Sequence, residues 1–298
     1  ITTGKQNTLI GSEAADALTT GTNNVAMGYL ALSTETAGDN SVAIGRSALG
    51  TQNTTTGGNI YNTAVGHAAG GAVTTGDSNT LIGGLAGDAL TEGDSNVAVG
   101  TGALGADTKG DRNIAIGAGT LESQNFSTKT DSYNIGVGHA AGSSVTTGVQ
   151  NTLIGGQAGD ALTDADFNVA VGMQALSADT LGSRSVAVGY GALTTQNFTT
   201  ATDAHNTAVG YLAGTAVTTG ANNTIIGASA GIALTSGTSN NLIGGLAGDA
   251  LTTGVSNNIM GVLCGTALTD ADYNVAIGQQ ALNADTLGST TVAIGSFA

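Results

Sequence analysis

The sequence contains no proline, no tryptophan and a single cysteine, and only 3 % of its 298 residues are aromatic. So few large side chains cannot fill one large globular core, and the 49 glycines indicate burial between short neighbouring segments instead. The single cysteine excludes a disulfide framework. No apolar run approaches the roughly 18 residues of a membrane span, and no signal peptide is visible.

Positive charge is also scarce. Six Lys and Arg residues stand against 21 Asp and Glu residues, which gives a net charge of −15. Nucleic acids and anionic membranes attract basic surfaces, so we expect neither as a partner. The charge balance is typical of a soluble surface that resists nonspecific association.

What the sequence does contain is one repeat. Segment 39–48 recurs in similar form along the whole chain, and its Gly45 serves as the reference position, the marker glycine. Successive markers are about 17 residues apart, with three longer steps of about 21 residues. Blocks of four repeats recur from Gly11, Gly83 and Gly155. The seventeen marker glycines are Gly11, Gly28, Gly45, Gly66, Gly83, Gly100, Gly117, Gly138, Gly155, Gly172, Gly189, Gly210, Gly227, Gly244, Gly261, Gly278 and Gly295.

Positions around the marker are nearly fixed. The residue before it is always Ile, Val or Met, and the third residue after it is Ala except at Thr120 and Cys264. We expect both positions to be buried. Asn stands four residues before the marker in fourteen repeats. Asn tolerates left-handed backbone and bonds its own main chain, so we expect it in turns.

The repeat predicts the fold class. A segment such as 96–100, β-branched and bounded by Asn and Gly, is typical of a strand of about four or five residues. A unit of about 17 residues is too short for a strand, a helix and two connections. We therefore predict an all-β, parallel β-solenoid (β-roll) of 17 coils, folded as a single domain over residues 1–298. Both ends of the sequence lie within a repeat, which favours a segment of a longer protein or ends covered by other chains.

The predicted strand is apolar on both faces. Side chains alternate along a strand, so Val97 and Val99 face one way and Ala98 the other. Strands that are apolar throughout are typical of sheets buried on both faces. We therefore expect a homo-oligomer whose strands pack around a shared axis, against the alternative that small alanine patches are simply exposed.

The three longer steps insert extra residues at 51–61, 123–133 and 195–205. Insertions in solenoids form loops on one face, often the contact face. Four of the ten aromatic residues fall in these insertions, and we take them as a candidate contact row: Tyr61, Phe126, Tyr133 and Phe198. The alternative is that they fold onto the adjacent coil.

Residues with catalytic or metal-binding chemistry are scattered. His67 and His139 occupy equivalent coils of successive blocks, about 19 Å apart in a stack of about 4.8 Å per coil, too far for one metal ion. Segment 227–231 matches G-x-S-x-G but lacks the strand-to-helix turn of a nucleophile elbow. We expect no catalytic site, no resident metal and no cofactor, and weak Ca²⁺ binding at the dispersed turn aspartates stays open.

A family resemblance accompanies these patterns. Segment 40–48, Asn-Ser-Val-Ala-Ile-Gly-Arg-Ser-Ala, resembles the head-domain repeat of trimeric autotransporter adhesins. Segments 62–69 and 206–211 resemble repeats of tail-fibre-like proteins from phages and from marine or soil bacteria. The resemblance implies a left-handed parallel β-roll, three chains around one axis, and a role in adhesion or as a fibre shaft.

The predicted function is therefore structural and non-enzymatic: an extracellular fibre segment, a tail-fibre shaft or an adhesin head, on a cell surface or a virion. One alternative is a filament subunit that stacks head to tail. Another is direct binding of a surface glycan or receptor along the insertions, or of ice along threonine pairs such as 74–75, 146–147 and 218–219. Because these pairs recur only every fourth coil, they argue against a flat ice-binding face.

Overall fold

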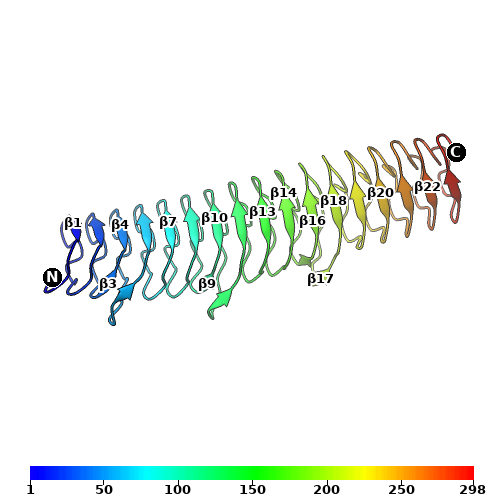
Figure 1. The fold of residues 1–298 in the computed structure, drawn as a ribbon. Helices are drawn as coiled ribbons and strands as arrows, with labels where there is room; N and C mark the ends of the chain where they lie inside the picture. Colours follow the sequence, from blue (N-terminus) through cyan, green and yellow to red (C-terminus); the bar gives the residue numbers. More distant parts are fainter. The chain divides into compact units, whose positions relative to one another are not determined.

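The computed structural model describes residues 1–298, an all-β chain without a helix. Seventeen three-residue strands follow one another at the period of the repeat and pair in parallel, which confirms the predicted β-solenoid. The chain divides into two compact units, residues 1–150 and 151–298, and each is a stack of coils (Figure 1). No helix in it could span a membrane.

In unit 1, each main strand pairs with the main strand of the next coil. Val97, Ala98 and Val99 lie opposite residues 114–116, so equivalent residues stack directly on one another. The main strands are β1 (Thr8–Ile10), β2 (Val25–Met27), β4 (Val42–Ile44), β6 (Thr63–Val65), β7 (Thr80–Ile82), β8 (Val97–Val99), β10 (Ile114–Ile116) and β12 (Ile135–Val137).

Unit 2 follows the same rule, and residues 169–171 lie opposite residues 186–188. Its main strands are β13 (Thr152–Ile154), β14 (Val169–Val171), β16 (Val186–Val188), β18 (Thr207–Val209), β19 (Thr224–Ile226), β20 (Asn241–Ile243), β21 (Asn258–Met260), β22 (Val275–Ile277) and β23 (Val292–Ile294).

The insertions add pairs of two-residue strands. In unit 1 these are β3 (Gly38–Asp39) with β5 (Gly58–Asn59), and β9 (Gly110–Asp111) with β11 (Thr130–Asp131). In unit 2, β15 (Gly182–Ser183) pairs with β17 (Thr202–Asp203). Figure 1 shows β3 and β9 at one edge of unit 1, away from the main strands. Each insertion therefore forms an ordered strand pair with the preceding coil.

The strands face the opposite way from the sequence-based expectation. The middle residue of each strand points into the coil, and Ala98 has no exposed surface. The residue before the marker, expected to be buried, points outward: Ile82 and Ile116 are each 39 % exposed. The expectation was wrong at this position because both strand faces are apolar, so the alternation carried no information about which one is inside.

The coil interior is filled by small and medium side chains. The alanine three residues after the marker is fully buried in most coils, as expected, and Cys264 occupies that position in its coil. Leucines such as Leu104 and Leu90 fill the remaining space. Because the middle strand residue, the alanine and one leucine fill the width of a coil, the core is thin and continues from coil to coil.

The asparagines form an interior ladder. Asn96 is fully buried, and its Oδ1 accepts the backbone N–H of Asn113 in the next coil at 2.9 Å. Its Nδ2 donates to the carbonyl oxygen of Gly110 at 2.9 Å, within its own coil. The left-handed backbone lies one residue earlier, at Ser95 with φ 59°. The expectation that Asn occupies the left-handed turn was therefore wrong by one residue, and its side chain bonds main-chain groups 14 and 17 residues away rather than those of a local turn.

Candidate functional site

The most extensive surface feature is the outer face of the main strands. We define it as the first and third residues of each main strand, which all point away from the core. The third residue is Ile, Val or Met in every coil, and the first is Val, Ile, Thr or Asn. Each unit therefore carries a continuous aliphatic row along its sheet.

This outer face carries no charge. The chain has 6 Lys and Arg and 21 Asp and Glu residues, and none of them occupies a main-strand position. The charged side chains lie in the turns and insertions. A chain of net charge −15 thus presents, along its main strands, an uncharged surface with one aliphatic row.

The structure separates the four residues of the predicted contact row. Phe126 and Phe198 are buried, with 6 % and 7 % of their surface exposed. Tyr61 and Tyr133 are 57 % and 48 % exposed. Only the two tyrosines, both in unit 1, present their rings to solvent, and a contact role for this row stays a prediction.

A buried carboxylate anchors each insertion. In the first, Glu35 Oε1 accepts the N–H groups of Gly38 at 2.7 Å and of Thr54 at 3.1 Å, and Gln52 donates to Oε2 at 2.9 Å. Burial disfavours ionisation of Glu35, but these hydrogen bonds, with that from the Thr54 hydroxyl, outweigh it and hold its pKa below the usual range. The carboxylate ties one coil to the loop of the next.

Asp107 has the equivalent role in the second insertion. Its Oδ1 accepts the N–H of Gly110 at 3.0 Å and that of Phe126 at 3.4 Å, and Gln124 donates to Oδ2 at 2.6 Å. Burial is the largest influence on Asp107, and it raises the pKa of this carboxyl although the hydrogen bonds partly oppose it. At Asp107 burial therefore outweighs the hydrogen bonds, whereas at Glu35 the hydrogen bonds outweigh burial.

Unit 2 repeats the arrangement at its own insertion. Asp179 Oδ1 accepts the N–H groups of Gly182 and Phe198, each at 3.0 Å, and Gln196 donates to Oδ2. The Gln196 Oε1 in turn accepts from Asn206, a member of the asparagine ladder, at 2.8 Å. The anchor is therefore connected through one glutamine to the interior ladder.

Sequence reasoning missed these anchors, although the sequence carries a signal for them. Seven residues after the marker, the coils without an insertion nearby carry a buried Leu or Val, such as Leu90 and Val73, with Asp285 as the one exception. Before each insertion two successive coils replace it with a carboxylate and a glutamine: Glu35 and Gln52, Asp107 and Gln124, Asp179 and Gln196. A carboxylate and a glutamine in successive coils of this otherwise apolar row therefore indicate an insertion whose backbone they bind.

The anchors predict opposite pH dependences for two isosteric variants. Glu35 stabilises the fold above its usual pKa, and this contribution is lost as the pH falls through its lowered value. Asp107 stabilises the fold at low pH and loses this contribution as the pH rises through its raised value. As the pH rises from about 3 to about 7, the stability advantage of wild type over Glu35→Gln should therefore grow. Its advantage over Asp107→Asn should shrink. Urea unfolding at several pH values measures both slopes, and slopes of the same sign would contradict the assignment.

A polar pair on the surface closes each insertion. The two partners are Asn40 and Asn59 in the first insertion, Arg112 and Asp131 in the second, and Arg184 and Asp203 in the third. Each pair joins the end of the inserted loop to the preceding coil. The second and third pairs are about half exposed, so we expect each to add at most about 1 kcal/mol.

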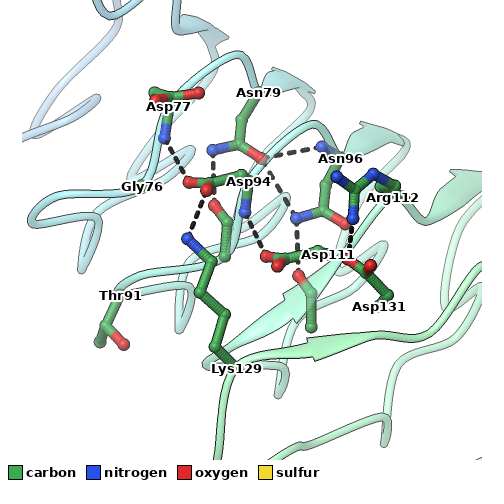
Figure 2. Close-up of polar contacts among 12 residues, drawn as sticks. Gly76, Asp77, Asn79, Thr91, Asp94, Asn96, Asp111, Arg112, Lys129 and Asp131 are labelled. Carbon is green, nitrogen blue, oxygen red and sulfur yellow. Dashed lines mark hydrogen bonds and ion pairs between the residues drawn. The ribbon is translucent and has the colours of Figure 1, made fainter.

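Three turn aspartates stack in unit 1 (Figure 2). Asp94 Oδ1 accepts the N–H of Asp77 at 2.9 Å, and Asp111 Oδ1 accepts the N–H of Asp94 at 2.7 Å. Lys129, from the second insertion, bonds the other oxygen of Asp94, and this bond raises the pKa of the lysine. The carboxylates of Asp94 and Asp111 thus bind backbone N–H groups, and that of Asp94 also binds a lysine. No group of three His, Cys, Asp or Glu residues in the chain is placed to hold a metal ion.

The threonine pattern is denser than the pairs in the sequence indicated. Eight residues after the marker, most coils carry threonine, and the hydroxyl of Thr74 donates to the carbonyl oxygen of Thr91 at 3.0 Å. Thr91 donates likewise to Thr108 at 3.0 Å. The first threonine of each pair therefore recurs in most coils, although the pairs 74–75, 146–147 and 218–219 recur every fourth coil. These hydroxyl groups donate hydrogen bonds to carbonyl oxygens of the next coil, and the bonds stabilise the stacking of coils.

The remaining reactive groups do not converge. His67, His139 and His205 are all exposed. Ser229 of the G-x-S-x-G segment lies in an ordinary turn after β19. Cys264 is fully buried, and burial raises the pKa of its thiol. Comparison with protein-family models, with curated proteins and with solved structures finds no match to this chain.

Proposed function

We propose that this chain is a non-enzymatic structural segment of an extracellular fibre, and that copies of it associate through the outer face of the main strands. The observation that carries the proposal is the uncharged aliphatic row along each sheet. Exposed apolar surfaces of this extent are typical of protein interaction sites.

Charge favours a second copy of the chain as the partner. Two copies that meet through their outer faces bring aliphatic rows together, while their acidic turns stay in solvent. Both copies also have the same coil spacing, so side chains that interdigitate in one coil interdigitate in the next. A partner without this period matches the rows over only a few coils.

The outer face of each unit has an area that can be compared with that of a standard interface. At about 4.8 Å per coil and 3.3 Å per residue, the outer face of each unit covers roughly 400 Å². Standard interfaces bury about 800 Å² per partner. The face of each unit by itself supplies about half of this area, and we propose that each takes part in association.

The resemblance to adhesin heads and tail-fibre repeats supports three chains around one axis and a role as a shaft or an adhesive head. Head-to-tail stacking into a filament is the alternative arrangement. The exposed rings of Tyr61 and Tyr133 are the observation that favours an additional contact with a glycan or receptor.

The proposal predicts the mass of the particle in solution. Light scattering should give about three times the chain mass of 28.6 kDa. Ile116→Glu together with Ile226→Glu places one carboxylate on the outer face of each unit, and burial of these charges costs several kcal/mol. We expect this variant to be monomeric, with an unchanged far-UV circular dichroism spectrum.

Thr75→Glu is the matched control, because Thr75 is exposed away from the outer face and the equivalent residue of the next coil is Glu92. It should leave the mass unchanged. A monomeric wild type would overturn the proposal, and open-ended fibres that survive the double substitution would favour the head-to-tail alternative.

A further inference from the structure

Each insertion contains the same short motif near its start. An asparagine followed at the second position by serine or threonine is a sequon, the motif that enzymes recognise when they attach a sugar to asparagine. The chain contains four sequons. Three occupy equivalent positions in the insertions, and their asparagines are Asn53, Asn125 and Asn197. The fourth begins at Asn222, outside the insertions, and provides an internal comparison.

The side-chain nitrogen of each insertion asparagine is free. Asn125 Oδ1 accepts the hydroxyl of Thr108 at 2.9 Å, and its backbone N–H donates to the carbonyl oxygen of Thr146 at 2.9 Å. Asn53 and Asn197 make the equivalent two bonds. In all three, Nδ2 donates no hydrogen bond within the chain, and Nδ2 is the atom to which a sugar is attached. The asparagine is therefore positioned through its other atoms.

The second half of each insertion sequon lies in a loop without backbone hydrogen bonds. The hydroxyl residues are exposed, and their hydroxyls bond to no group of the chain: Thr55, Ser127 and Thr199. The backbone N–H groups that follow also have no acceptor within the chain, in segments 55–57, 127–129 and 199–201. This part of the loop can therefore adapt to the active site of an enzyme while the coils stay stacked.

The sequon at Asn222 has a different setting, although its asparagine is also exposed. The backbone N–H of Asn222 donates to the carbonyl oxygen of Ala204 at 2.8 Å. Thr224 is the first residue of β19, and its N–H donates to the carbonyl oxygen of Asn240 at 2.8 Å. Between them, Asn223 is fully buried in the asparagine ladder. An enzyme can bind this sequon only after the local strand pairing has opened.

We propose that Asn53, Asn125 and Asn197 are acceptor sites for N-linked sugars in the folded protein. The co-substrate is a diphosphate-activated sugar, and the transferase is a separate enzyme. Nδ2 forms a bond to the anomeric carbon of the sugar, and the bond from that carbon to the diphosphate oxygen breaks. The diphosphate leaves with the electron pair, and Nδ2 loses one proton to a base of the transferase.

The position of these sites is compatible with the proposed function but does not depend on it. In unit 1, the strands of the insertions lie at one edge, away from the main strands (Figure 1). Sugars attached there leave the outer face of unit 1 free for another copy. A monomeric wild type would therefore overturn self-association and leave this inference intact.

Transfer of sugar to the folded chain tests the inference. The purified chain is incubated with uridine diphosphate glucose and a soluble N-glycosyltransferase that recognises the sequon. Mass spectrometry of the intact chain and of its peptides then counts and locates the attached glucose. We expect glucose on all three insertion asparagines and at least about tenfold less on Asn222, because modification there requires local unfolding.

Variants at the second insertion provide matched controls. Ser127→Ala removes the hydroxyl of the sequon, and Asn125→Thr introduces the residue that most coils carry at this position. Each should lose glucose at this site alone, with an unchanged far-UV circular dichroism spectrum. Thr128→Ala lies outside the sequon and should keep all three sites.

Two results with the purified chain would overturn the inference: no transfer to the insertion asparagines, or equal transfer to Asn222. The chain isolated from the cells that produce it should also carry sugar at the insertion asparagines, as peptide mass spectrometry can show. An unmodified natural chain would overturn the inference even if the purified chain accepts glucose.

Discussion

Replacement of Gly100 by alanine should destabilise the protein by about 3 to 5 kcal/mol. The marker glycine has φ 136°, a conformation that residues with a Cβ rarely adopt. A Cβ at this position would also lie 2.5 Å from the carbonyl oxygen of Gly117 in the next coil. The two coils would have to separate, which breaks the strand pairing on both sides of the clash.

The measurement combines urea unfolding with native-state amide hydrogen exchange. Gly100→Ala should lower the unfolding midpoint and reduce protection in segment 97–117. Gly84→Ala is the matched control, because Gly84 lacks a positive φ and a Cβ there would meet nothing within 4 Å. Equal midpoints for the two variants would show that close approach of coils at the marker does not limit stability.

Replacement of Asn223 by alanine should cost about 3 to 5 kcal/mol, because it leaves two buried backbone groups without partners. Asn223 Oδ1 accepts the N–H of Asn240 at 3.0 Å, and its Nδ2 donates to the carbonyl oxygen of Gly237 at 2.9 Å. Both groups are shielded from water, since Asn223 and Asn240 have no exposed surface. The same urea and hydrogen-exchange measurements apply.

Two further variants distinguish the loss of the ladder's hydrogen bonds from the simple loss of side-chain volume. Asn222→Ser changes the exposed neighbour at φ 60°, where other coils carry Ser78 and Ser95, and it should be neutral. Asn223→Asp keeps the acceptor but places a second oxygen against the Gly237 carbonyl. It should be destabilising at neutral pH and less so in acid, where the protonated carboxyl can donate. Equal stability of Asn223→Ala and Asn222→Ser would contradict the ladder's role.

The period and chemistry of the repeat were sufficient to predict the fold class. A glycine that recurs about every 17 residues, with a β-branched segment before it and an alanine after it, leaves room for one strand per coil and no helix. Parallel stacking follows, because identical coils satisfy each other's backbone groups only in the same register. The insertions were equally readable as departures from the period, and the structure places short paired strands in all three.

The insertions also show where sequence reasoning ended. All four aromatic residues looked alike as candidates for a contact surface, yet Phe126 is buried and Tyr133 is exposed. The backbone N–H of Phe126 is bound to Asp107, a buried residue of the preceding coil. That partner is distant in sequence, so only the stacked coils reveal that the loop begins inside the core.

The sequence by itself determined that this protein is a stack of short parallel strands with two apolar strand faces. Tertiary structure alone decided which face is inside. A coil is closed by the turn after the marker, whose alanine and leucine leave space for only one more row of small or medium side chains. The middle strand residue fills that row, and the flanking Ile, Val and Met residues therefore lie on the outside.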